Sequence, residues 1–374
     1  MAARSAQMVS YFKPGQTMWR NSSLKLSTLV CLCLLTIIFA SMNKLFPDVL
    51  GFVKPQFLRD APSSKDSRCQ LKLQLDPCKC SRTIHWYSPY CPSQVIRSNT
   101  SIKDKIDIVV DEWQKQSTCG TWATLRGPAQ KVVSYSLYGK FPSEYHSGLE
   151  QLAPLVVKMY PEWVMRIYLD LSLKQQREWA CNLACNNQHI DLCDTGNISG
   201  VGDVRQSSGT SWRFCVVGDP LVERYIVRDA DSPILQREVD AVDDWISSGK
   251  CFHVMRDNAH HGVSMVAGTW GGCNTWQASK ATPIRDSMLK SSLAWNQDQP
   301  VLWAYMWPWA IMNVTIHDSY TCLRFPGSLP FPTQRYNDTF IGMRSYREEF
   351  KNDGVRSECP MECRPAQHKD WKYC

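Results

Sequence analysis

Two aspartates separated by one residue, Asp229 and Asp231, follow a β-rich apolar stretch at residues 224–227 after the single residue Arg228, and this is the only Asp-x-Asp in the chain. Where a strand ends and the chain bends, two carboxylates at this spacing can both turn toward one hard cation. Oxygen ligands suit Mg²⁺ or Mn²⁺. Such a cation can bridge the phosphates of a nucleotide sugar and stabilise the charge of the leaving diphosphate. A solvated turn that caps the following helix is the alternative interpretation.

Histidines are the next candidates for chemistry. Imidazole is a good third ligand for a divalent cation already held by two carboxylates, which makes His317 a candidate metal ligand. His253, His260 and His261 cluster with Asp257 along the chain. These three histidines could bind a sugar, a phosphate or a second metal, or they could be structural histidines with satisfied hydrogen bonds.

Two further carboxylates, Asp257 and Asp298, are the candidates to contact an acceptor or to act as a general base. An inverting transferase needs a base within hydrogen-bond reach of the acceptor hydroxyl, whereas a retaining enzyme does not. Four tryptophans close together could stack on sugars or pack in the core: Trp295, Trp303, Trp307 and Trp309. Three acidic residues on an expected helix are interpreted as solvated or capping groups: Glu238, Asp243 and Asp244.

The elements that must position these residues alternate between strand and helix. Residues 132–138 and 163–169 are rich in β-branched, aromatic and apolar residues, and residues 144–160 between them carry apolar residues at helical spacing. A further helix and strand are expected over residues 211–227, and another strand at residues 312–316 precedes His317. This order predicts an α/β fold with a mostly parallel sheet, whose strands end at a crevice where ligands bind.

Several short blocks resemble a known family. Residues 212–214, 219–220 and 225–231 resemble the segment leading into the DxD motif of GT-A glycosyltransferases, and are most similar to the glycogenin-like and galactosyltransferase-like group called family 8. Later blocks follow in the family's order: residues 263–271, similar to the strand lining the donor sugar, then Asp298-Gln299, then His317. The block at His317 lacks the family's glycine and Lys-Pro-Trp pattern. The resemblance spans residues 131–347.

The resemblance implies a GT-A fold and a metal-assisted transfer from a nucleotide sugar, most simply a UDP-sugar with Mn²⁺ or Mg²⁺. The implied metal ligands are Asp229, Asp231 and His317. The implied nucleotide-sugar residues are Tyr135, Leu137, Tyr138, Arg213, Arg228 and Gly268. Asp298 and Asp257 are the expected catalytic carboxylates.

The cysteine content indicates an oxidising compartment. Of seventeen cysteines, two fall in the apolar segment at residues 26–42, which leaves fifteen. Close pairs such as Cys78 and Cys80 lack the matching histidines or second Cys-x-x-Cys of zinc fingers, so disulfides are expected. Because fifteen is odd, one thiol is free or joins another chain. We expect that thiol to be Cys374, which makes a disulfide-linked homodimer a candidate assembly.

The N-terminal part predicts a single-pass type II membrane protein. Residues 26–42 are uncharged and apolar, and positive charge precedes them, which favours an uncleaved anchor with residues 1–25 in the cytosol over a cleaved signal peptide. Residues 43–68 are expected to form a stem, residues 69–130 a cysteine-rich extension and residues 131–374 the catalytic domain. N-glycosylation sequons beyond the anchor, such as that at Asn337, agree with a luminal location, and the short anchor favours the Golgi.

Composition narrows the function classes. The net charge of +7 lies partly in the N-terminal tail, and no Lys/Arg block interleaves with aromatics, which argues against nucleic acid as a partner. The leading prediction is a Golgi glycosyltransferase acting on a glycan, lipid or protein acceptor. The alternatives are a non-catalytic, membrane-tethered glycan-binding protein of the same fold and, less favoured, a metal-dependent hydrolase. The sugar, the acceptor and the anomeric outcome stay open.

Overall fold

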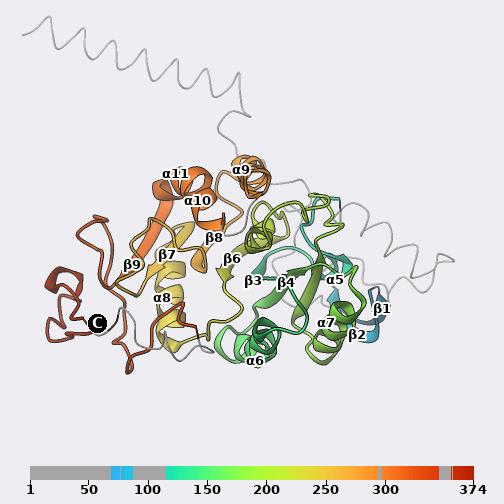
Figure 1. Cartoon of the computed structure of the whole chain (residues 1–374), viewed down its shortest axis with the longest axis horizontal. Helices are drawn as coiled ribbons and strands as arrows, with labels where there is room; N and C mark the ends of the chain where they lie inside the picture. Colours follow the sequence, from blue (N-terminus) through green and yellow to red (C-terminus); the bar gives the residue numbers. More distant parts are fainter. Residues whose placement is uncertain (1–68, 76, 87–114, 294–296, 345–354, 356) are drawn as a thin grey trace, which may run out of the picture. The chain divides into compact units, whose positions relative to one another are not determined.

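The computed structural model describes residues 69–75, 77–86, 115–293, 297–344, 355 and 357–374, within a compact unit that spans Ser64–Cys374. The described part contains a seven-stranded sheet in the order β5-β4-β3-β6-β8-β7-β9 and a separate two-stranded hairpin (Figure 1). No helix of this part is long and apolar enough to cross a membrane. The predicted tail, anchor and stem at residues 1–68 lie outside the described residues.

The first half of the sheet is built from parallel strands with helical crossovers. It consists of β3 (Gln130–Leu137), α6 (Glu144–Met159), β4 (Val164–Leu169), α7 (Lys174–Asn186) and β5 (Ile190–Asp194). β3 pairs in parallel with β4, and β4 with β5. The expected strand, helix and strand over residues 132–169 are therefore confirmed.

The second half begins with a crossover to the other side of β3. The 3₁₀ helix η1 (Gly209–Val216) leads into β6 (Val222–Arg228), which pairs in parallel with β3. The remaining strands are β7 (Phe252–Arg256), β8 (Thr269–Cys273) and β9 (Val314–Asp318). β8 is antiparallel to both of its neighbours, and β9 is parallel to β7. The sheet is thus mixed but mostly parallel, as predicted, and compatible with a Rossmann-like fold.

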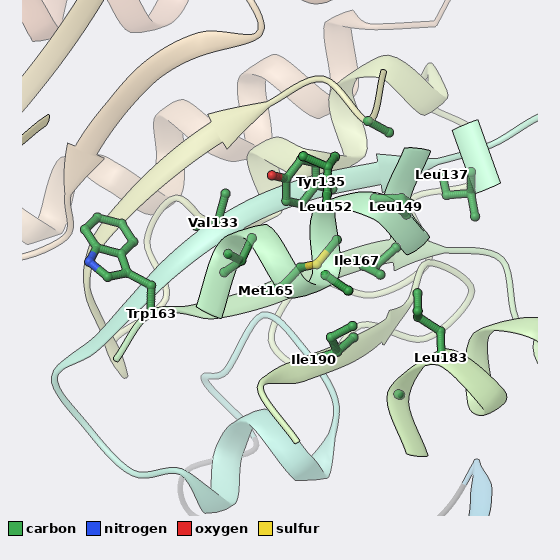
Figure 2. Packing of buried hydrophobic residues seen from close by; sticks show 14 of the residues in the cluster. Val133, Tyr135, Leu137, Leu149, Leu152, Trp163, Met165, Ile167, Leu183 and Ile190 are labelled. Atoms are coloured by element: carbon green, nitrogen blue, oxygen red, sulfur yellow. The ribbon is translucent and has the colours of Figure 1, made fainter. Parts of the chain in front are cut away.

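Helices cover both faces of this sheet (Figure 1). On one face, α6, α7 and α8 (Gln236–Ser247) pack on the strands. On the other lie η1, α9 (Ala278–Ser291) and a run of short helices: α10 (Asp298–Val301), η2 (Leu302–Met306), α11 (Trp307–Ala310) and η3 (Ile311–Asn313). Figure 2 shows the core of the first face, where side chains of β3 and β4 meet Leu149 and Leu152 of α6. Each such buried aliphatic side chain contributes about 1.5–3 kcal/mol.

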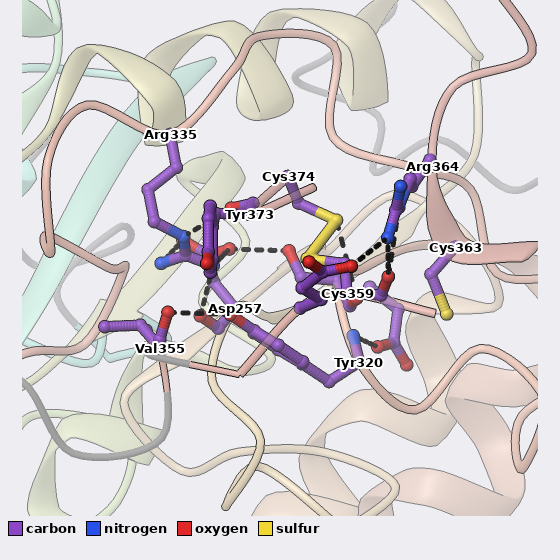
Figure 3. Close-up of a disulfide and its surroundings, with 12 residues drawn as sticks. Asp257, Tyr320, Arg335, Val355, Cys359, Cys363, Arg364, Tyr373 and Cys374 are labelled. Carbon is purple, nitrogen blue, oxygen red and sulfur yellow. Dashed lines mark hydrogen bonds and ion pairs between the residues drawn. A yellow bond between two sulfur atoms is a disulfide. The ribbon is translucent and has the colours of Figure 1, made fainter. Parts of the chain in front are cut away.

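Disulfides attach the peripheral segments to this core. The hairpin of β1 (Cys69–Leu75) and β2 (Cys78–Trp86) is tied to α7, and the segment before α5 (Thr121–Leu125) is tied to β5. The C-terminal segment, with η5 (Met361–Cys363), carries two more, and Figure 3 shows the one between Cys359 and Cys374. The pairs are Cys78–Cys181, Cys80–Cys185, Cys119–Cys193, Cys251–Cys273, Cys322–Cys363 and Cys359–Cys374.

The prediction of a free thiol at Cys374 was wrong. Cys374 is bonded to Cys359, and the free cysteine of the described residues is the buried Cys215 on η1. The last residue is held because the backbone N–H of Arg335 donates to its carbonyl at 2.8 Å. The sequence shows only that the number of cysteines is odd, and not which pairs the fold brings together.

Candidate functional site

The sheet has a topological switch point between β3 and β6. From β3 the chain proceeds through β4 to β5 on one side, and then returns to β6 on the other side of β3. Ligands of open α/β sheets bind in the crevice outside the carboxyl ends of the strands at such a point. Tyr138 directly follows β3, and Asp229 directly follows β6. The Asp-x-Asp motif therefore lies where this fold type places ligands.

Arg213 of η1 joins the motif to the Asp-Gln block. Its Nη1 donates to the carbonyl of Arg228 at 3.0 Å and forms an ion pair with Asp229, while its Nη2 donates to Asp298 Oδ2 at 2.9 Å. Arg213 is buried, whereas the Asp229 side chain is 40% exposed. Arg213 thus brings together Asp229 and Asp298, which lie 69 positions apart in sequence.

Arg228 fixes the turn that carries the two aspartates through contacts inside the protein. This side chain is fully buried, pairs with Glu238 of α8, and donates to the carbonyls of Ser232 at 3.1 Å and Pro233 at 2.9 Å. Arg228 was expected to bind the nucleotide sugar, but its guanidinium points into the protein. Its contacts give it a positioning role for the turn at residues 229–233.

The surroundings of the two aspartates shift their pKa values in opposite directions. Burial raises the pKa of Asp229, but the nearby Arg213 guanidinium outweighs that effect and leaves the pKa below its usual value. Burial and then the negative charge of Asp229 raise the pKa of Asp231, which also lies 3.5 Å from Arg344 Nε. Two neighbouring carboxylates that repel each other form a setting that a divalent cation stabilises.

Because Gly268 has no side chain, the Asp229 carboxylate has room beside it. A Cβ built on Gly268, just before β8, would lie 1.9 Å from Asp229 Oδ2 and 2.4 Å from its Cγ. Any side chain at this position would therefore displace the carboxylate. This cradle, together with two oxygen-ligand side chains, fits Mg²⁺ or Mn²⁺, which typically takes one or two carboxylates plus substrate phosphates. No group of three or more His, Cys, Asp or Glu side chains suited to a metal occurs in the described part of the chain.

A cavity of about 390 Å³ adjoins Asp229. One wall follows β7, another is the loop after β9, and the start of β8 lies between them. Its lining combines polar and apolar residues, as is usual for small-molecule sites. The lining residues are Asp229, Asn258, His260, His261, Val266, Thr269, Phe340, Gly342 and Arg344.

The face of β3 decides which of its residues can reach the site. Tyr135 and Leu137 are buried in the core that faces α6, and neither has surface available for a nucleotide. Side chains alternate along a strand, so Ser134 and Tyr138 point to the opposite face. There Ser134 donates to the carbonyl of Arg213 at 2.7 Å. Burial raises the pKa of Tyr138 to about 12, and the charge of the nearby Arg213 opposes that rise. Of the three nucleotide contacts predicted in and just after β3, Tyr138 alone lies beside the site.

Asp257 is enclosed rather than presented to a ligand. Its carboxylate pairs with Arg237 of α8 at 3.1 Å and Arg335 at 2.8 Å, and it accepts from Ser319 at 2.7 Å. It also accepts from the backbone N–H of Ile341 at 3.1 Å. All these contacts are buried, which differs from its expected role as an acceptor-contacting base (Figure 3 shows Asp257 and Arg335). Asp257 instead ties together the two loops that form the cavity walls.

The ring of His317 makes its hydrogen bonds to residues other than Asp229 and Asp231. Its Nδ1 is 2.8 Å from His253 Nε2, its Nε2 is 3.2 Å from Asp244 Oδ2, and its ring is buried. Trp245 of α8 stacks on His253 at 5.2 Å. With both ring nitrogens of His317 engaged, the structure shows a structural histidine pair and not the expected third metal ligand.

Sequence reasoning missed the residues that close the cavity. Phe340, Gly342 and Arg344 lie more than a hundred positions after Asp229, and no local spacing marks them. Glu238 was expected to be a solvated or capping group, but it is fully buried between Arg228 and Tyr160, whose hydroxyl donates to it at 2.8 Å. A carboxylate on a regular amphipathic helix gives no sequence signal of such a partner.

The tryptophans divide between core and surface. Trp309 is buried and stacks on Trp276 at 5.8 Å, whereas the Trp303 side chain is 66% exposed. Trp295 lies outside the described residues. Trp303 lines a second cavity of about 310 Å³ with Gln299 and Arg324.

Comparison with known proteins adds no family assignment. No protein-family model matches the chain, and no curated protein matches it.

Proposed function

We propose that this domain has the GT-A fold and is a metal-dependent glycosyltransferase that uses a nucleotide sugar, most simply a UDP-sugar. One observation carries the proposal. The only Asp-x-Asp of the chain stands at the carboxyl end of β6, beside the switch point of the sheet, with Asp229 lining a cavity and held by Arg213. Ligand position follows from sheet topology, and the oxygen ligands specify the type of cation.

In this proposal Asp229 and Asp231 hold Mn²⁺ or Mg²⁺. The bound cation would neutralise the charge that develops on the diphosphate leaving group. Arg213 keeps Asp229 ionised and correctly oriented, because its guanidinium bonds both that carboxylate and the preceding backbone carbonyl. Positioning groups of this kind, themselves locked by packing, typically change metal affinity by 10–100-fold when they are removed.

Asp298 is the better candidate for the second catalytic carboxylate. Its side chain is 14% exposed and bonds Arg213, so it lies at the same edge as Asp229. Asp257, by contrast, has no exposed side-chain surface. We therefore assign Asp298 to acceptor contact or proton transfer, and Asp257 to positioning. This assignment leaves both anomeric outcomes open.

The cellular setting belongs to the same proposal. An anchor at residues 26–42, a stem and a disulfide-rich domain describe a type II Golgi enzyme with its catalytic domain in the lumen. The described disulfides agree with an oxidising compartment. The acceptor would be a glycan, a lipid or a protein hydroxyl.

The test is donor hydrolysis by the full-length chain purified in detergent. A panel of UDP- and GDP-sugars is incubated with and without Mn²⁺, because many transferases slowly hydrolyse their donor without an acceptor. We expect turnover of one donor that requires Mn²⁺ and is lost in Asp229→Asn and Asp231→Asn. The exposed Asp243→Asn on α8 is the matched control and should keep full turnover. A folded protein that neither hydrolyses a donor nor binds a nucleotide would favour the glycan-binding alternative.

A further inference from the structure

The turn after β7 fixes the imidazole of His261. Asn258 closes the turn twice, since its Oδ1 accepts the backbone N–H of His260 at 2.8 Å and its carbonyl accepts the N–H of His261 at 2.9 Å. The backbone N–H of Asp257 then donates to His261 Nδ1 at 3.2 Å. Because Asp257 is itself held by two arginines, this donor cannot turn away without breaking the turn.

That hydrogen bond decides the tautomer. A nitrogen that accepts a hydrogen bond carries no proton, so the neutral ring must carry its proton on Nε2. Burial lowers the pKa of His261 to about 4, which keeps the ring neutral at the pH of the secretory pathway. His261 is therefore a neutral N–H donor whose direction is set by the protein.

The Nε2 edge faces the cavity beside Asp229. A Cβ built on Gly342, a cavity-lining residue, would lie 3.6 Å from His261 Cε1 and 3.9 Å from Nε2. Phe340 packs against the ring at 5.9 Å in an edge arrangement. Nε2 has no hydrogen-bond partner among the residues that the structure describes. The turn holds this N–H donor at the cavity wall. A ligand with a hydrogen-bond acceptor could pair with it there.

We infer that His261 binds an oxygen of the nucleotide sugar through Nε2–H, as a hydrogen-bond donor and not as a metal ligand. This inference rests on the proposed function and adds a binding residue to the same site. The acceptor is either a diphosphate oxygen or a hydroxyl of the sugar, both of which carry lone pairs that fit one N–H donor. The cavity that joins His261 to Asp229 places both ligand parts within one site.

Metal ligation by His261 conflicts with the same geometry. A cation on Nε2 would require the proton on Nδ1, where the N–H of Asp257 already points at 3.2 Å. Two N–H groups would then face each other, and the turn would have to open. The ring therefore complements the aspartates, which would bind the cation, by binding the oxygen groups of the ligand.

The test uses two substitutions that separate the ring nitrogens. His261→Gln places an amide N–H near the position of Nε2, whereas His261→Asn can accept from Asp257 but offers no donor at Nε2. The full-length chain and both variants are titrated calorimetrically with Mn²⁺ alone, with UDP plus Mn²⁺, and with UDP-glucose and UDP-galactose plus Mn²⁺. Thermal unfolding verifies that each variant is folded.

We expect His261→Asn to weaken nucleotide binding about tenfold, His261→Gln to stay within about threefold of the wild type, and Mn²⁺ binding to be unchanged. Weakening for UDP as well as UDP-sugars identifies a diphosphate oxygen, and weakening for a UDP-sugar alone identifies a sugar hydroxyl. Wild-type affinity of His261→Asn for every nucleotide overturns the inference, and so does a loss of Mn²⁺ binding. A wild type that binds no nucleotide contradicts the proposed function itself, and the inference with it.

Discussion

Substitution of Gly268 by alanine tests the geometry of the aspartate site without removing any of its functional groups. The new Cβ would lie 1.9 Å from Asp229 Oδ2, well inside van der Waals contact, so the carboxylate must move by more than about 1 Å. The backbone at Gly268 has no positive φ, so alanine is tolerated there by the main chain. Any effect of the substitution therefore comes from the steric collision between the new Cβ and the Asp229 carboxylate.

Two magnitudes follow from this collision. Overpacking of this kind costs about 1–3 kcal/mol of folding free energy, at the lower end here because the Asp229 side chain is 40% exposed and can move toward solvent. Displacement of a metal-binding carboxylate from Arg213 should weaken Mn²⁺–UDP binding by about 10–100-fold. Binding should therefore fall far more than stability.

Calorimetric titration with Mn²⁺ and UDP, beside urea unfolding, measures both quantities. Gly262→Ala is the matched control, because its nearest foreign atom is the flexible end of Arg324 at 3.3 Å. The control should keep wild-type affinity. A folded Gly268→Ala protein that binds Mn²⁺–UDP as tightly as the wild type would refute the placement of Asp229 in the site.

Three further outcomes follow from the buried groups. Asp257→Asn should lower the free energy of unfolding in urea by about 3–5 kcal/mol, because it removes a buried carboxylate charge from two arginines. Asp298→Asn should fold normally and lose donor turnover. The reverse pattern would restore Asp257 as the candidate base. Burial lowers the pKa of His317 from 6.5 to about 4, so its contribution to stability is complete above pH 6.5 and is lost as the pH falls toward 4. That loss amounts to ~3 kcal/mol, and urea midpoints in His317→Asn should depend less on pH than those of the wild type. Burial also raises the pKa of the Cys215 thiol to about 12, so alkylation should label Cys215 only after unfolding. Peptide mapping should find Cys374 bonded to Cys359 of the same chain. Labelling of Cys374 in the native protein would contradict this pairing.

The parts of the fold that local patterns encode were predictable. Residues 132–138 and 163–169 form β3 and β4 because their β-branched and aromatic side chains pack on a buried sheet. The position of Asp229 at a strand end followed from the apolar run before it. The parallel pairing of these strands followed from the helical segment between them.

Features that depend on distant contacts were not predictable from these patterns. Tyr135 and Tyr138 looked equivalent in sequence, and only the pairing of β3 shows which one shares a face with Arg213. Residues 263–268 were expected to belong to a strand, but β8 begins at Thr269. His317 followed a strand as expected, yet His253 on the neighbouring strand and Asp244 on α8 occupy its ring nitrogens. Such partners lie more than sixty residues away in the chain.

The central claim is that Asp229 and Asp231 form a cation site that binds a nucleotide diphosphate. Its most direct test is UDP binding to the full-length chain with and without Mn²⁺, in the wild type, Asp229→Asn and Asp231→Asn. The account predicts binding that requires Mn²⁺ and weakens at least about tenfold in both variants. Equal binding with and without Mn²⁺, or wild-type affinity in either folded variant, would contradict it.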